Sequence, residues 1–205
     1  MKKTIGLALA VATMLLSMPF SAMAASSSTA PITTSATVAQ ALTLNVLLKK
    51  NDSAGATISS MNFGQLVDIG TGTLRSTPTS TTGTGAVAAF ISANSQGLPY
   101  TITQVGTGMS NGSASLPSGA LNVVPVYAAA DNGGAVLPAG ASIGPKGSWV
   151  GTRTLYTSES GTAASRTIQA IYSVTDDPAA GATSGVPQSQ AAGTYTGTVT
   201  ITVTA

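Results

Sequence analysis

The chain ends in Thr194-Tyr195-Thr196-Gly197-Thr198-Val199-Thr200-Ile201-Thr202-Val203-Thr204-Ala205. Successive side chains of a β-strand point to opposite faces, so strict alternation predicts a half-buried strand here. One face carries Tyr195, Val199, Ile201 and Val203, and the other carries threonines. The sequence stops directly after this strand. Because most sandwich domains add a further hairpin partner at this point, we expect one sheet to be a strand short.

The same period recurs upstream, where residues 41–48 place Leu42, Leu44, Val46 and Leu48 on one face. Further strands are predicted at residues 58–66, 85–93, 100–105, 121–127, 149–157, 167–174 and 195–204. Clusters of Gly, Pro, Ser and Thr predict loops at residues 71–84, 106–119, 131–147 and 175–193. No helix is evident. Short, numerous strands of this kind predict an all-β antiparallel sandwich.

The first 24 residues have the three parts of a secretory signal peptide. Lys2 and Lys3 precede an apolar run over residues 5–16, and small residues surround Met23. The run is shorter than the roughly 20 residues that a membrane-spanning helix needs. We therefore expect residues 1–24 to be removed after Ala24, a domain at residues 41–205, and export of the protein.

Composition excludes most enzyme classes. The chain has no cysteine and no histidine, and only 7% of its residues are charged. A zinc finger, a thiolate nucleophile and a Ser-His-Asp triad each need an imidazole or a thiolate. Removal of Lys2 and Lys3 leaves six basic residues against six acidic ones, so nucleic acid is not an expected partner. We predict no catalysis, no metal, no cofactor and no small-molecule substrate.

Three local patterns have an ordinary structural interpretation. Residues 83–88 match a relaxed dinucleotide-binding motif, but a Thr/Ser loop precedes them and a strand-like run follows. Asp176-Asp177-Pro178 is typical of a solvated turn, and the spacing is not that of a calcium loop. Trp149 could contact a sugar, but it is predicted to anchor the core or a loop. Separately, residues 181–185 are predicted to form a loop that tolerates an inserted tag.

Residues 25–40 form a Ser/Thr/Ala-rich N-terminal extension in which Ile32, Thr34, Ala36 and Val38 share one parity. Two interpretations remain. The segment is either an extended strand that pairs outside its own domain or a tail left after signal cleavage. A terminal strand that lacks its partner favours the first.

Together these features resemble the chaperone-usher pilins, and most closely their spore coat U-like, or archaic, branch. The resemblance rests on the terminal strand and the extension, and on three internal pieces in the expected order: Phe63-Gly64, residues 97–102 and residues 167–172. Many members of that branch carry a disulfide, whereas this chain has no cysteine. The chain is thus similar to the family while departing from one of its features.

The resemblance implies an incomplete immunoglobulin-like sandwich. Its missing strand is supplied first by a periplasmic chaperone and then by the extension of the next subunit, a mode of strand addition called donor-strand complementation. It implies that Ile32, Thr34, Ala36 and Val38 form the donor strand. The implied contacts of chaperone and donor strand are Tyr195, Val199, Ile201, Val203 and the chain end at Ala205.

The implied partners are identical or related pilin subunits, the periplasmic chaperone and an outer-membrane usher. The implied location is a pilus, or fimbrium, on the cell surface, where it serves adhesion or biofilm formation. The alternative is a self-contained secreted β-sandwich, either an adhesin or a carbohydrate-binding module. Its stability would not depend on residues 25–40.

Overall fold

The computed structural model describes residues 42–50, 55–68, 70–76, 85–161 and 163–205. All of them belong to one compact unit, Ala39–Ala205. The predicted signal peptide and the extension with Ile32, Thr34, Ala36 and Val38 lie outside the described residues. Those predictions therefore stay predictions.

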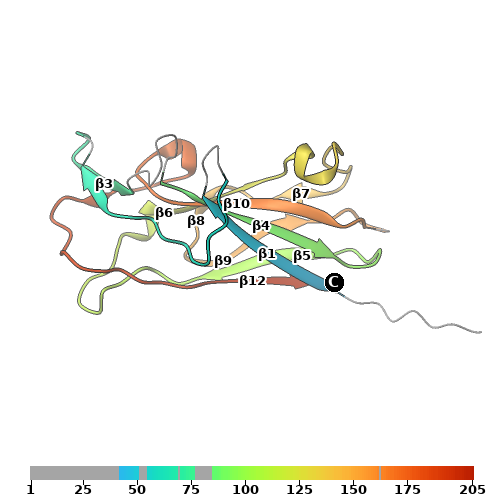
Figure 1. Ribbon diagram of the computed structural model, residues 1–205, viewed down its shortest axis with the longest axis horizontal. Coiled ribbons are helices and arrows are strands. Elements are labelled where there is room, and N and C mark those ends of the chain that lie inside the picture. The colour runs from blue at the N-terminus through green and yellow to red at the C-terminus, as the bar shows by residue number, and fades with distance from the viewer. Residues whose placement is uncertain (1–41, 51–54, 69, 77–84, 162) are drawn as a thin grey trace, which may run out of the picture. The chain divides into compact units, whose positions relative to one another are not determined.

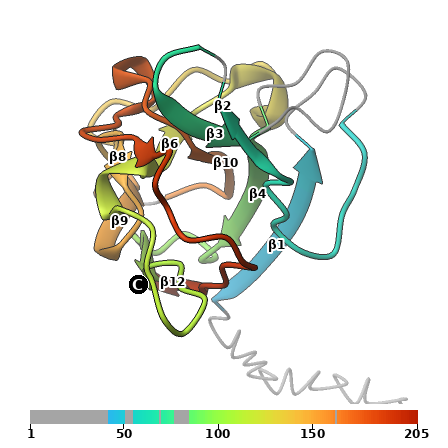
Figure 2. The same cartoon turned by 90° about the vertical axis from the view of Figure 1, so that its left-hand side faces the viewer.

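The described residues form an all-β antiparallel fold, as predicted (Figures 1 and 2). A five-stranded sheet has the order β1 (Thr43–Lys50), β4 (Val87–Asn94), β10 (Arg166–Val174), β6 (Leu121–Val126) and β8 (Gly147–Ser148). A four-stranded sheet has the order β12 (Val199–Thr204), β5 (Thr101–Gly106), β9 (Gly151–Thr157) and β7 (Ser142–Ile143). A small third sheet contains β11 (Val186–Pro187), β3 (Thr73–Ser76) and β2 (Leu66–Asp68).

One hydrophobic core lies between the two larger sheets, as in a β-sandwich. Strand β4 shows how the sequence builds it, because Val87, Ala89, Ile91 and Ala93 alternate inward and are at most 2% exposed. The four-stranded sheet contributes Ile102, Leu155 and Tyr156, each 0% exposed.

Trp149 anchors this core, which confirms the prediction made for it. Its side chain is 3% exposed and stacks on Phe63 at 5.3 Å between ring centroids. Tyr172 meets the same indole edge-on at 5.7 Å. Aromatic pairs in these geometries stabilise a core beyond the area that they bury.

Several boundaries differ from the prediction. The strand predicted at residues 58–66 is wrong, since only Leu66 belongs to a strand. Gly64 has a φ of 71°, and its N–H donates to Asn62 Oδ1 at 2.9 Å, so a turn interrupts the extended chain. The loops predicted at residues 71–84, 131–147 and 175–193 contain the short strands β3, β7 and β11.

Among the described residues the helices are single 3₁₀ turns: η1 (Ser118–Ala120), η2 (Ala129–Asn132) and η3 (Pro178–Ala180). Asp177 caps η3 by accepting a hydrogen bond from the N–H of Ala179 at 2.8 Å. The predicted turn at Asp177-Pro178 is thus confirmed. In the part of the chain that the structure describes, no helix has the length and hydrophobicity to span a membrane.

Asp176 was predicted to lie in a solvated turn, but its side chain makes structural contacts, so the prediction is wrong for this residue. Its carboxylate accepts hydrogen bonds from Thr73 and Arg75 and so ties β3 to the end of β10. Burial alone would raise the pKa of this carboxyl, but the hydrogen bonds from Thr73 and Arg75 outweigh it and hold the pKa below its usual value.

We expect Asp176→Asn to lower the free energy of unfolding by about 1 kcal/mol at pH 7. Because the folded-state pKa is lowered, this contribution is complete above the ordinary carboxyl pKa and is lost as the pH falls through the folded-state value. Urea unfolding of both proteins should therefore show a difference at pH 7 that vanishes near about pH 2. A difference independent of pH would contradict the assignment.

Candidate functional site

The two larger sheets each end in a strand with one unpaired side. Among the described residues, β12 pairs only with β5, and residues 43–47 of β1 pair only with β4. The last residues of β1 have a second partner, since the N–H of Ile58 donates to the carbonyl of Leu48 and the N–H of Lys50 donates to the carbonyl of Ala56, each at 3.0 Å. Figures 1 and 2 show β1 and β12 running in opposite directions, with the Thr43 end of β1 beside the C-terminal end of β12. An edge strand presents a row of unpaired N–H and C=O groups. Here two such rows flank the same side of the sandwich.

The inner face of β1 is poorly covered. Leu44 lies opposite Ala93 and Val46 lies opposite Ile91, so these side chains point to the same, inner face. Ala93 and Ile91 are 1% and 0% exposed, whereas Leu44 and Val46 are 36% and 39% exposed. Apolar side chains directed at the core thus remain in contact with solvent.

Strand β12 repeats this pattern on the other sheet. Val199, Ile201 and Val203 are half-buried against the core, while the intervening threonines are exposed. This confirms the alternation predicted for residues 199–204. We call the two edges together the open edge, defined by Leu44 and Val46 on β1 and by Val199, Ile201 and Val203 on β12.

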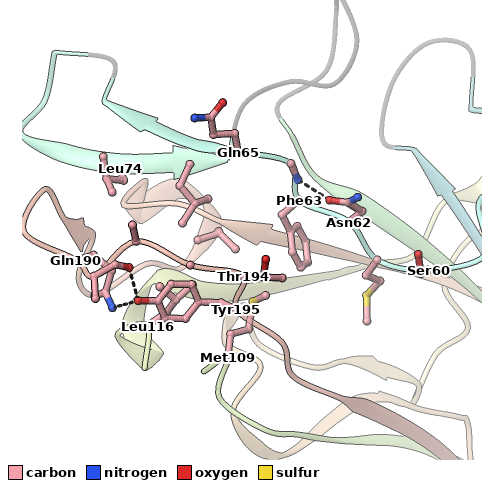
Figure 3. A pocket seen from close by; sticks show the side chains of 17 residues that line it. Ser60, Asn62, Phe63, Gln65, Leu74, Met109, Leu116, Gln190, Thr194 and Tyr195 are labelled. Carbon is pink, nitrogen blue, oxygen red and sulfur yellow. Dashed lines mark hydrogen bonds between the residues drawn. The ribbon is translucent and has the colours of Figure 1, made fainter. Parts of the chain in front are cut away.

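A pocket of about 640 Å³ lies between residues 60–66 and residues 190–195 (Figure 3). Residues 60–66 follow β1 in the chain and residues 190–195 precede β12. Because the two strands run in opposite directions, the pocket lies beyond the same end of the open edge. Phe63, Leu74, Met109 and Leu116 line it with apolar side chains. Its lining holds no Asp, Glu, Lys or Arg.

Tyr195 belongs to this pocket and not to the terminal strand, so its strand assignment is wrong. Its hydroxyl donates to the carbonyl of Ala191 at 2.6 Å and accepts from Gln190 Nε2 at 2.7 Å. These bonds hold the ring in a loop that precedes β12. Ala205, the predicted chaperone anchor, is exposed beyond the end of β12.

A buried polar group supports the sheet beneath β12. Gln104, which lies opposite Ile201, is 0% exposed. Its Oε1 accepts from the Tyr172 hydroxyl at 2.6 Å, and its Nε2 donates to the carbonyl of Trp149 at 3.2 Å. Burial raises the pKa of Tyr172, so this phenol stays protonated and acts as a structural donor.

The pKa values of two other tyrosines, Tyr100 and Tyr156, are also raised. Burial, followed by the charge of Glu159, raises the pKa of Tyr100 to about 12. Burial, the neighbouring Tyr100 and Glu159 raise the pKa of Tyr156 as well. Phenols that stay protonated through the physiological range are poor acid–base groups. The buried phenols of the sandwich therefore serve as structural groups.

Sequence reasoning identified the β12 side of the open edge and missed the rest. The alternation of Leu42, Leu44, Val46 and Leu48 was visible, but a single face of leucines does not say whether another strand covers it. Phe63 and Met109 come from segments that are not strands, so no periodicity marks them. Compared with known proteins, the sequence matches no family model and no curated protein at a significant level.

Val46→Ala and Val123→Ala form a matched pair that measures the exposure of the inner face. Val46 is 39% exposed and Val123 is 0% exposed. We expect Val46→Ala to cost less than about 1 kcal/mol and Val123→Ala about 2 kcal/mol or more, since only the latter leaves a cavity. Urea unfolding of the full chain, purified as a monomer, measures both. Equal losses would mean that the inner face of β1 is covered.

Proposed function

We propose that this chain is a structural, non-catalytic subunit that polymerises into a surface pilus by donor-strand exchange. The observation that carries the proposal is the open edge, where two edge strands expose inward-directed apolar side chains and unpaired backbone groups. Both are costly to leave in water. One additional strand, laid along this edge, would satisfy both.

The strand order supports an immunoglobulin-like assignment. The run β1-β4-β10-β6 has the neighbours and the chain order of immunoglobulin strands A, B, E and D, and the pair β12-β5 has those of F and C. The next strand of that sheet, β9, follows β6 in the chain and so does not take the place of C′. In that scheme the last strand, G, lies beside F, which places it next to β12. The proposed donor strand occupies this position.

The donor strand is the N-terminal extension of the next subunit. Its inward-pointing side chains would be Ile32, Thr34, Ala36 and Val38, because every second side chain of a strand lies on the same face. About four inserted side chains and about ten paired backbone groups give a gross gain of about 10 to 15 kcal/mol. The entropy of ordering the extension offsets part of it. The linkage needs no disulfide, in keeping with a chain that has no cysteine.

Before assembly the same edge needs a temporary partner. A periplasmic chaperone fulfils this role in the proposal by pairing with β12, and an outer-membrane usher then exchanges it for the next extension. The exposed position of Ala205 leaves its terminal carboxylate accessible to basic residues of the chaperone. Export through the periplasm and display on the cell surface follow from this route.

Deletion of residues 25–38 should abolish polymer and leave export intact, because the subunit keeps its own edge but cannot complete a neighbour. Val38→Asp should impair assembly far more than its control Ala39→Asp, since only Val38 shares the inward parity. Electron microscopy of the cell surface measures fibres. Normal fibres from the deletion refute donor-strand exchange, and equal effects of the two point variants refute the register.

A tag added after Ala205 should cause loss of the subunit before assembly, since each added residue moves the carboxylate by about 3.3 Å along the strand. The control tag belongs between Val136 and Leu137, because Val136 is 78% exposed. Residues 181–185 form a loop, as predicted, and Thr183 and Ser184 are exposed, but the ends of this loop pack too closely to be the control site. Ala182 is 9% exposed, and a Cβ at Gly185 would lie 2.6 Å from Thr73 Cγ2.

Chaperone-bound subunit and surface fibres are then measured for both tagged proteins. We expect the tag after Val136 to preserve both and the tag after Ala205 to reduce both. Equal assembly of the two would show that the terminal carboxylate is not recognised.

A further inference from the structure

The outer face of the five-stranded sheet has a polar cavity that the proposed function does not use. Its volume is about 260 Å³. Thr43 and Asn45 on β1, Ser92 on β4 and Thr167 on β10 line it from the sheet. Asp131 and Asn132 of the 3₁₀ turn η2 close one side. The cavity therefore combines three neighbouring strands and one turn.

The strand register places this cavity on the side of the sheet away from the core. Asn45, Ser92 and Thr167 lie opposite one another in a single row across β1, β4 and β10. Their neighbours along β4 and β10, Ile91 and Ile168, point to the core and are 0% exposed. Alternation thus directs the row outward.

The floor of the cavity is held in place. Ser92 Oγ and Thr167 Oγ1 are hydrogen-bonded at 2.9 Å. Asn132 accepts from the N–H of Thr167 at 2.9 Å and donates to its carbonyl at 3.0 Å, which fixes η2 against β10. Preformed polar groups of this kind reduce the ordering cost of binding.

The rim carries uncommitted polar groups. The side chains of Thr43 and Asn45 are exposed and have no hydrogen-bond partner among the described residues. Hydroxyl and amide groups can each donate and accept hydrogen bonds. The two charged lining residues, Asp131 and Arg166, have opposite sign, so the cavity has no formal net charge. These properties favour a neutral ligand rich in hydroxyl groups.

The next row of the same outer face is apolar on β1 and β4, and polar on β10, where Gln169 lies opposite Phe90. Leu47 lies opposite Phe90, and this pair is two residues along each strand from the pair Asn45 and Ser92. Leu47 is 39% exposed, and the Lys49 amino group lies 4.6 Å from the centroid of the Phe90 ring. A pyranose ring has polar hydroxyl edges and apolar C–H faces, so a polar row beside the apolar pair Leu47 and Phe90 matches two adjoining sugar units.

We propose that the outer face of β1, β4 and β10 binds a neutral oligosaccharide. One sugar unit occupies the polar cavity, with its hydroxyls bonded to Thr43, Asn45 and Asp131, and the next lies over Leu47 at the edge of the Phe90 ring, whose face Lys49 covers. This site uses the outer face of β1, whereas the open edge uses its inner face. It therefore does not rest on the proposed function.

The test is saturation-transfer NMR with the purified full chain, a method that works for monomers and polymers alike. The probes are lactose, cellobiose, maltose, chitobiose and mannobiose, with sialyllactose as a charged comparison. The variant Thr43→Ala/Asn45→Ala removes the two uncommitted side chains. Its matched control is Thr152→Ala/Thr154→Ala, which changes two exposed strand residues on the other sheet.

We expect at least one neutral probe to bind saturably, the Thr43/Asn45 variant to bind it at least tenfold more weakly, and the control to bind as the original protein does. Thermal unfolding checks that both variants are folded. Absence of saturable binding by every neutral probe, binding of sialyllactose alone, or equal binding by the two variants overturns the proposal. None of these outcomes depends on whether the protein forms fibres.

Discussion

The unpaired side of an edge strand is the constraint on which this structure depends. Inside each larger sheet, every strand has neighbours that satisfy its backbone and cover its apolar face, so residues such as Ile91 and Ile102 reach 0% exposure. The two sheets end at β1 and β12, although apolar and polar residues still alternate along both strands, as they do in a strand with a neighbour on each side. The apolar inner faces of both edges are the reason for proposing that the fold is completed from outside.

An added strand can pair with such an edge in a defined position only if the sheet beneath the edge is rigid. The chain has no disulfide with which to brace it. Gln104 instead bonds to Tyr172 and to the carbonyl of Trp149, and so joins the two sheets directly under β12. An apolar residue at position 104 could pack in several ways, but a buried amide must find specific partners, because an unsatisfied one is costly. The polar bonds therefore define where β5, and with it β12, must lie.

Local periodicity was enough to predict the fold class and most long strands, because a half-buried strand shows its two faces in its own sequence. It failed at residues 58–66, where a turn at Asn62-Phe63-Gly64 breaks an apolar segment. It also missed β3, which depends on the distant carboxylate of Asp176. Neither the pocket at Phe63 and Tyr195 nor the polar row on the outer sheet face could be predicted, since segments far apart in sequence form each of them.

Strand β1 shows how period two lets one short segment serve two purposes. Leu44 and Val46 lie on its inner face, and Thr43 and Asn45 lie on its outer face. A donor strand beside the inner face would leave the outer face in solvent, so the proposed assembly and the proposed saccharide binding would not compete. In a fibre, every subunit would then repeat the same weak site at a regular spacing. Because many linked sites bind a surface far more tightly than one, a polymer could adhere through contacts that would be negligible in a monomer.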